Sequence, residues 1–242
     1  MKKRIWELDA LRGLCVLGMI IVHFIFDLVD GYGLVSWEYP GIVLFLFEWG
    51  GILFLLISGA CATLGSRSVR RGLIVFGCGM LCTIVTQTMV NMDMLSRWMV
   101  IRFGVLHCLG LCMILWLLFK RLPAAVLAVL GIGFIALGFY FASLTVSTRW
   151  LYPLGLMYPG FSSGDYFPLF PNLGYFLIGA LIGRSLYRKK ESLLPRVNPN
   201  NPVLRFLQFC GKHSLWIYLL HQPVLTGLFE ILSLFTLSGG TS

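Results

Sequence analysis

The first long apolar run of the chain contains three ionisable residues, Arg12, His23 and Asp27. Arg12 and His23 are eleven positions apart, which in an α-helix places their side chains within about 20° of one face and about 16 Å apart along the axis. Asp27 follows His23 by one turn on a similar face, close enough to accept a hydrogen bond from the imidazole. A carboxylate beside a histidine fixes its tautomer and raises its basicity. The pattern therefore predicts a general base at His23, supported by Asp27.

Each of these residues also has a simpler interpretation. Arg12 alone would be expected to extend toward lipid headgroups, and His23 alone to pack against a neighbouring helix. An ionisable side chain at the centre of a membrane span costs roughly 2.5 kcal/mol or more, so three on one stripe indicate a function. His213 and His221 lie in the last apolar run, the second about 12 Å deeper than the first. Taken alone, each of these two histidines is more typical of a hydrogen-bonded contact between helices than of a catalytic residue.

The composition requires a membrane around these residues. Of the 242 residues, 58% are hydrophobic and only 12% are charged, whereas soluble domains carry about 25% charged residues. The net charge of +9 comes from short clusters between apolar runs, which argues against nucleic acid as a partner. The seven cysteines lack C-x-x-C spacing, so we interpret them as packing residues and predict no metal site.

Seven apolar runs are long enough to span a bilayer, which needs roughly 20 residues. We therefore predict an all-α polytopic membrane protein that forms a single transmembrane domain over residues 1–242. The predicted spans are Leu11–Val29, Gly41–Leu64, Gly72–Val90, Trp98–Phe119, Pro123–Leu144, Leu169–Leu186 and Ser214–Leu234.

Alternate connectors, beginning with the N-terminal segment, are strongly cationic, which places them in the cytoplasm. Their cationic clusters are Lys2–Arg4, Arg67–Arg71, Lys120–Arg121 and Arg188–Arg196. The N-terminus is then cytoplasmic, and the C-terminus lies on the opposite side.

Two further segments are distinctive. Ser147–Pro168 is long and aromatic and is predicted on the outside, either as an interfacial belt or as a substrate platform. Val203–Gly211 is predicted as an amphipathic stretch on the cytoplasmic surface.

Several stretches together resemble a known family. The segment Leu8–Gly13, continuing to His23, resembles the R-x10-H first helix of membrane acyltransferases that acetylate cell-surface sugars. The whole chain is similar to a bacterial member of the heparan-α-glucosaminide N-acetyltransferase catalytic-domain family. The other supporting stretches are Arg102–Gly110, Asp165–Gly174, Gly183–Arg184, Gly211–Ser214 and Ile217–Pro223.

The resemblance implies an enzyme of the bacterial cytoplasmic membrane that moves an acetyl group from cytoplasmic acetyl-CoA to an acceptor, typically a sugar, on the far side. His23, oriented by Asp27, would take the acceptor's proton, or would carry the acetyl group as an acyl-histidine. Acceptor contacts are expected from Arg102, His107 and Asp165. Donor contacts are expected from cytoplasmic cations and the last-helix histidines: Arg12, Arg184, Arg188, Arg205, Lys212, His213 and His221.

The chain departs from the eukaryotic enzyme of this family, which has an asparagine at the position of His23 and a histidine in the following loop. Residues 31–40 contain no histidine here. Seven spans are also fewer than that enzyme has, so we expect a minimal core or a homodimer. The main alternative function is a small transporter or proton-coupled permease that uses the same buried His and Asp residues. A retinal-type sensor would need a lysine inside the last helix, and Lys212 lies only at its edge.

Overall fold

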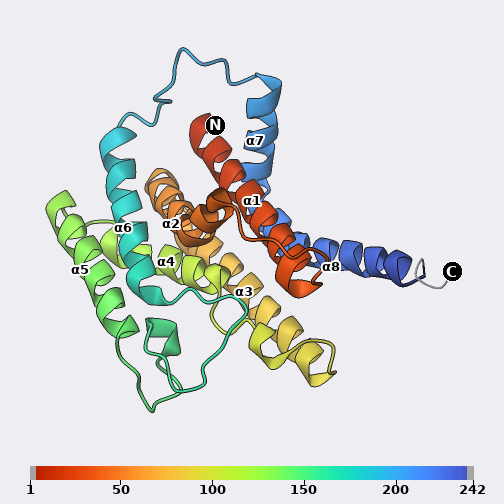
Figure 1. The fold of residues 1–242 in the computed structure, drawn as a ribbon. Coiled ribbons are helices and arrows are strands. Elements are labelled where there is room, and N and C mark those ends of the chain that lie inside the picture. Colours follow the sequence, from red (N-terminus) through yellow and green to blue (C-terminus); the bar gives the residue numbers. More distant parts are fainter. Residues whose placement is uncertain (1–3, 239–242) are drawn as a thin grey trace. The chain divides into compact units, whose positions relative to one another are not determined.

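The computed structural model describes residues 4–238, which fold into helices joined by short and long connectors (Figure 1). Within these residues, six helices are long and apolar enough to cross a membrane, and α4 is a shorter apolar helix. The prediction of an all-α polytopic membrane protein with about seven spans is confirmed. The α-helices are α1 (Trp6–Phe26), α2 (Gly41–Leu64), α3 (Ser68–Asn91), α4 (Val105–Phe119), α5 (Ala124–Ala142), α6 (Leu169–Leu186), α7 (Pro202–Lys212) and α8 (Ser214–Ser238).

The chain divides into two compact units. The terminal unit comprises Arg4–Leu53 together with the described residues from Leu194 onward, and the central unit comprises Phe54–Leu193. The chain passes between them within α2. The terminal unit therefore holds α1, α7, α8 and the first half of α2, and the central unit holds the rest.

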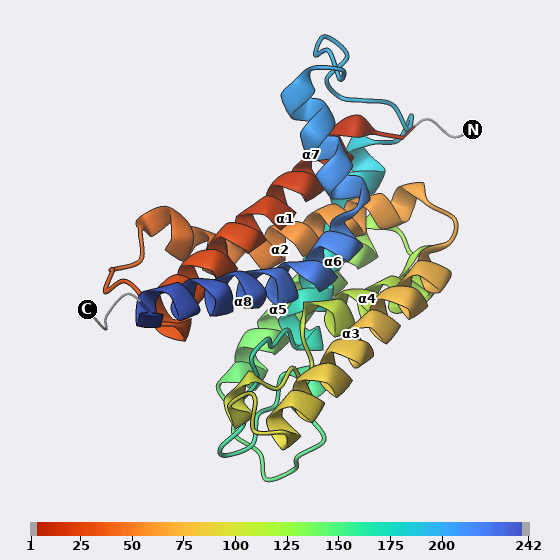
Figure 2. The same ribbon diagram turned by 90° about the vertical axis from the view of Figure 1, so that its right-hand side faces the viewer.

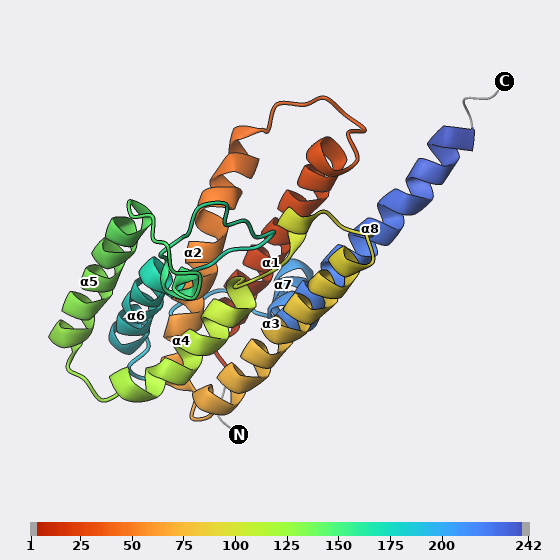
Figure 3. The same cartoon turned by 90° about the horizontal axis from the view of Figure 1, so that it is seen from below.

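The central unit is built from two helix pairs, α3 with α4 and α5 with α6 (Figure 3). α4 also packs against α6, and the second half of α2 joins them. The centre of this unit is apolar and fully buried, with Leu55, Leu127, Phe176 and Leu177 among the side chains that expose essentially no surface.

Glycines bring these helices into close contact. A methyl group added at Gly72 or Gly110 would meet the facing backbone of the α3–α4 pair, and one at Gly174 would meet the backbone of α5. Gly59 of α2 faces the Phe176 carbonyl of α6 in the same way. Small residues at helix crossings are typical of membrane proteins, where association depends on close packing rather than on the hydrophobic effect.

The fourth span begins later than predicted. We expected Trp98–Phe119, but α4 starts at Val105, and the residues before it form a 3₁₀ turn and an extended segment. The Val105 amide donates to the Asp165 carboxylate at 2.9 Å, a capping contact that suits the positive end of a helix. Because this capping group comes from a distant loop, the apolar pattern of residues 98–104 could not reveal it.

In the terminal unit, α7 packs along the N-terminal half of α1 (Figure 2). Two glycines make this contact close. A methyl group at Gly13 would collide with the Leu207 carbonyl of α7, and one at Gly211 would collide with the Asp9 carbonyl of α1. The segment predicted as amphipathic, Val203–Gly211, is therefore a helix, and its glycine end rests directly on the α1 backbone.

We expect Gly211→Ala to destabilise the protein by about 1–3 kcal/mol, because a backbone carbonyl cannot move aside as a flexible side chain would. Gly227→Ala is the matched control, since no atom of the described residues lies within 4 Å of a methyl group there. It should be neutral or stabilising by up to about 1 kcal/mol, because alanine is the better helix former. Thermal unfolding in detergent measures both, and equal melting temperatures for the two variants would contradict the close α1–α7 contact.

Candidate active site

A line of polar contacts joins α1 to α8 within the terminal unit. Arg12 Nη2 donates to Ser214 Oγ at 3.2 Å. Further along, the rings of His23 and His221 are in contact, with centroids 4.8 Å apart and planes tilted by 55°. Beyond them, the Gln222 amide donates to both Asp27 oxygens, at 3.0 and 3.3 Å. We call this set the polar seam; its members are Arg12, His23, Asp27, Ser214, His221 and Gln222.

The order of contacts shows that α1 and α8 run in the same direction. Successive partners along α1 meet successive partners along α8, and the series ends where the Tyr32 hydroxyl donates to Glu230 at 3.2 Å. Burial and the neighbouring Glu230 carboxylate raise the pKa of the Tyr32 phenol, so it stays protonated and able to donate. Parallel first and last spans are what an odd number of crossings requires.

His221 has a defined tautomer. Its Nδ1 lies 2.5 Å from the Tyr218 carbonyl oxygen, which can only accept, so Nδ1 carries a proton and, in the neutral ring, Nε2 has a lone pair. That Nε2 is buried and makes no hydrogen bond with any described residue, and the same is true of Gln222 Oε1. Buried acceptors are rarely left without a donor. The seam can therefore receive a hydroxyl or amine group from a bound molecule.

Asp27 does not hold His23 as expected. Among the described residues, Asp27 accepts side-chain hydrogen bonds from Gln222 and none from His23. Asp27 is only 6% exposed, and it lies where the helix opens into a π-helical turn, Asp27–Gly31. A buried carboxylate gains most from a donor that reaches both oxygens, which the Gln222 amide does. Asp27 therefore orients α8, while the ring of His23 contacts His221.

In the central unit, His107 is fully engaged by its neighbours. It is 2% exposed; its Nδ1 accepts from the Gly104 amide at 3.2 Å, and its Nε2 lies 3.2 Å from Thr83 Oγ1. Thr83 in turn donates to the Ile101 carbonyl at 2.6 Å. Both ring nitrogens therefore have partners within the central unit, and the contact of His107 with the acceptor stays a prediction.

Arg102 and Asp165 join two loops to the start of α4. The Arg102 Nε donates to the Ser162 carbonyl at 3.0 Å, and its backbone amide donates to Ser163 Oγ at 3.1 Å. Asp165 caps α4 through Val105, and a parallel bridge pairs Phe103 with Tyr166. The two stretches that carried much of the family resemblance, Arg102–Gly110 and Asp165–Gly174, thus form one structural joint.

Comparison with known proteins decides the family. Residues 4–223 match the family model described as heparan-alpha-glucosaminide N-acetyltransferase, catalytic. The chain belongs to this family. The match covers nearly the whole chain and includes residues of both compact units, and it identifies a transmembrane acetyltransferase. No curated protein and no solved structure gave a significant match.

The residues that we predicted to contact the donor of this acetyltransferase divide between the two units. Arg184 binds the central unit itself: it donates to the Leu122 carbonyl at 2.7 Å and to the Lys120 carbonyl, and it lies 5.1 Å from the Trp116 ring centre. Arg188 is exposed just after α6. The terminal unit contains Arg12 and His221 in the seam, and the exposed Arg205, Lys212 and His213.

Sequence reasoning missed Ser214 and Gln222, and it assigned His221 only to donor binding. Gln222 had a usable signal, because a primary amide inside an apolar run is expensive unless it is paired. Ser214 had no such signal, since a serine at the start of a helix is ordinary. The tautomer of His221 depends on the local helix geometry around Tyr218, which residue types do not reveal.

Proposed function

We propose that this family member transfers an acetyl group from cytoplasmic acetyl-CoA to a hydroxyl or amine on an extracytoplasmic acceptor, a sugar in the simplest case. The observation that supports this most strongly is the pair of imidazoles in the polar seam, where the buried Nε2 of His221 has no donor among the described residues. Such a nitrogen is suited to accept a proton from an attacking hydroxyl or amine.

The donor would reach the pair from the cationic end of the seam. Arg12 contacts Ser214, which directly follows Lys212 and His213 in the chain. Cationic side chains bind phosphate groups through charge-assisted hydrogen bonds. The eleven residues from Arg12 to His23 span about 16 Å along α1, a length that the extended pantetheine arm of CoA can cover.

The two histidines divide the proton transfers in this mechanism. As the acceptor oxygen or nitrogen bonds to the acetyl carbonyl carbon, His221 Nε2 takes its proton. The carbon–sulfur bond then breaks, and the neutral His23 ring relays this proton: it takes a proton from His221 at one ring nitrogen and gives one to the departing CoA thiolate from the other. Both rings are then neutral again, and the acceptor's proton leaves on CoA. Asp27 and Gln222 position α8 during these steps.

Arg12→Ala is expected to weaken acetyl-CoA binding by about tenfold, because it removes one charge-assisted contact to phosphate. The difference from wild type should shrink as ionic strength rises, because salt screens the attraction between the guanidinium and the phosphates. Acetyl-CoA-dependent thermal stabilisation of the detergent-solubilised protein measures the affinity.

Arg70→Ala is the control, because Arg70 is an exposed cation at the start of α3 that no part of the proposal uses. It should bind acetyl-CoA like wild type. Equal affinity for all three proteins would remove Arg12 from the donor site. A wild-type protein that is not stabilised by acetyl-CoA would favour the transporter alternative.

A further inference from the structure

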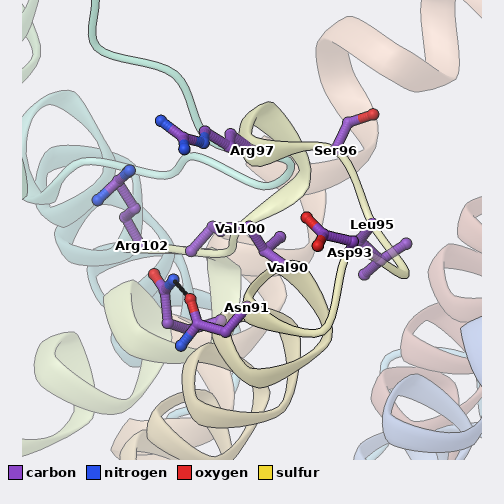
Figure 4. Close-up of a pocket in the computed structure, with 9 residues that line it drawn as sticks. Val90, Asn91, Asp93, Leu95, Ser96, Arg97, Val100 and Arg102 are labelled. Atoms are coloured by element: carbon purple, nitrogen blue, oxygen red, sulfur yellow. Dashed lines mark hydrogen bonds between the residues drawn. The ribbon is translucent and has the colours of Figure 1, made fainter.

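The central unit contains a pocket of about 550 Å³ where α3 ends and the connector to α4 begins. Its charges are arranged asymmetrically: Figure 4 shows the side chains of Arg97 and Arg102 on one side and the Asp93 carboxylate on the other. The nine lining residues are Gln87, Val90, Asn91, Asp93, Leu95, Ser96, Arg97, Val100 and Arg102.

Both guanidinium groups are available to a ligand. Arg102 is anchored through Nε to the Ser162 carbonyl, and no described residue receives a hydrogen bond from its two terminal nitrogens. Arg97 and Asp93 form no ion pair with each other or with any other described residue. Gln87 donates to Asn91 at 2.9 Å, which places a pair of amides at the pocket as well.

The pocket opens at the membrane boundary. The α3 span ends at Asn91, and the apolar side chains that follow are strongly exposed: Met92 by 66%, Met94 by 65% and Trp98 by 50%. Exposed tryptophan beside the end of a span is typical of the headgroup level of a bilayer. This end of α3 is opposite the Arg67–Arg71 cluster, so the predicted orientation places it outside the cytoplasm.

We propose that this pocket binds the headgroup of a zwitterionic phospholipid that carries a phosphate and a primary ammonium, as in phosphatidylethanolamine. Arg97 and Arg102 bind the phosphate, a match that planar guanidinium groups make well. Asp93, on the other side, binds the ammonium. The acyl chains lie in the bilayer beside Met92, Met94 and Trp98. This site is separate from the polar seam and does not depend on the proposed acetyl transfer.

Native mass spectrometry and thermal shift of the full chain in detergent test the site with four probes. These are phosphatidylethanolamine, phosphatidylglycerol, diacylglycerol and soluble phosphoethanolamine. Wild-type protein should bind phosphatidylethanolamine most tightly and diacylglycerol least. Phosphoethanolamine should bind at least about tenfold more weakly than the lipid, because it lacks the buried chains.

Substitutions in the pocket test recognition of the phosphate and of the ammonium separately. Arg97→Gln and Arg102→Gln should each weaken the binding of both phospholipids by about tenfold. Asp93→Asn should weaken the binding of phosphatidylethanolamine only. Arg149→Gln, an exposed arginine of the same predicted side outside the pocket, should change nothing. Melting without added lipid reports folding, and Arg97→Gln is the safer variant because its side chain has no partner among the described residues.

Three results would overturn the proposal. Phospholipid binding that survives both arginine substitutions would place the lipid elsewhere. Phosphoethanolamine that binds as tightly as the lipid would identify a free phosphorylated amine as the ligand. Equal affinity for the two phospholipids, unchanged by Asp93→Asn, would show that the pocket does not recognise the ammonium. Wild-type protein that binds the lipid but transfers no acetyl group would contradict the proposed function and leave this site standing.

Discussion

His221→Ala is expected to lower the rate of acetyl transfer by about 10²–10⁴-fold, the usual contribution of a positioned general base. Its Nδ1 lies against the Tyr218 carbonyl, which leaves Nε2 of the neutral ring with a lone pair, and no residue in the described part of the chain donates to that nitrogen. The loss should fall on kcat, since the base acts on the transition state rather than on substrate binding. Acetyl-CoA affinity should remain close to wild type.

Acetyl-CoA-dependent CoA release with a sugar or amine acceptor measures the rate, and thermal shift measures donor affinity. Leu220→Ala is the matched control: it lies next to His221 on α8, but its side chain is 56% exposed. It should retain near wild-type transfer. If His221→Ala also keeps near wild-type kcat, then His221 only packs against His23, and the base must be sought elsewhere.

His23→Ala is expected to cost about 10²-fold in kcat, because the CoA thiolate then leaves without its proton donor. The ring contact between His23 and His221 means that the two act as a unit. The double variant should therefore be no more than about threefold slower than the worse single variant. Fully additive losses would mean that the two imidazoles act independently.

Rapid-quench experiments with labelled acetyl-CoA and no acceptor distinguish direct transfer from a covalent route. Direct transfer predicts no label on the wild-type protein. Label that forms on wild type and disappears in His23→Ala would instead establish an acyl-histidine at His23. Near wild-type turnover by His23→Ala would exclude His23 from both routes.

The sequence by itself determined the membrane architecture. Apolar runs of sufficient length can be satisfied only by spanning helices, and the structure has such helices at six of the predicted places and a shorter one at the seventh. It also determined that Arg12 and His23 share a face, because helical spacing is local geometry. Both residues contact α8, as a shared face requires.

Tertiary structure alone decided the partners of these residues. Asp27 contacts Gln222 rather than His23, His221 contacts His23, and α4 begins where Asp165 caps it. Each contact joins residues from different elements of the chain, and the choice depends on which donors packing brings within reach. Helical periodicity describes one helix at a time. It orients a side chain toward a neighbour but contains no information about which residue the neighbour presents.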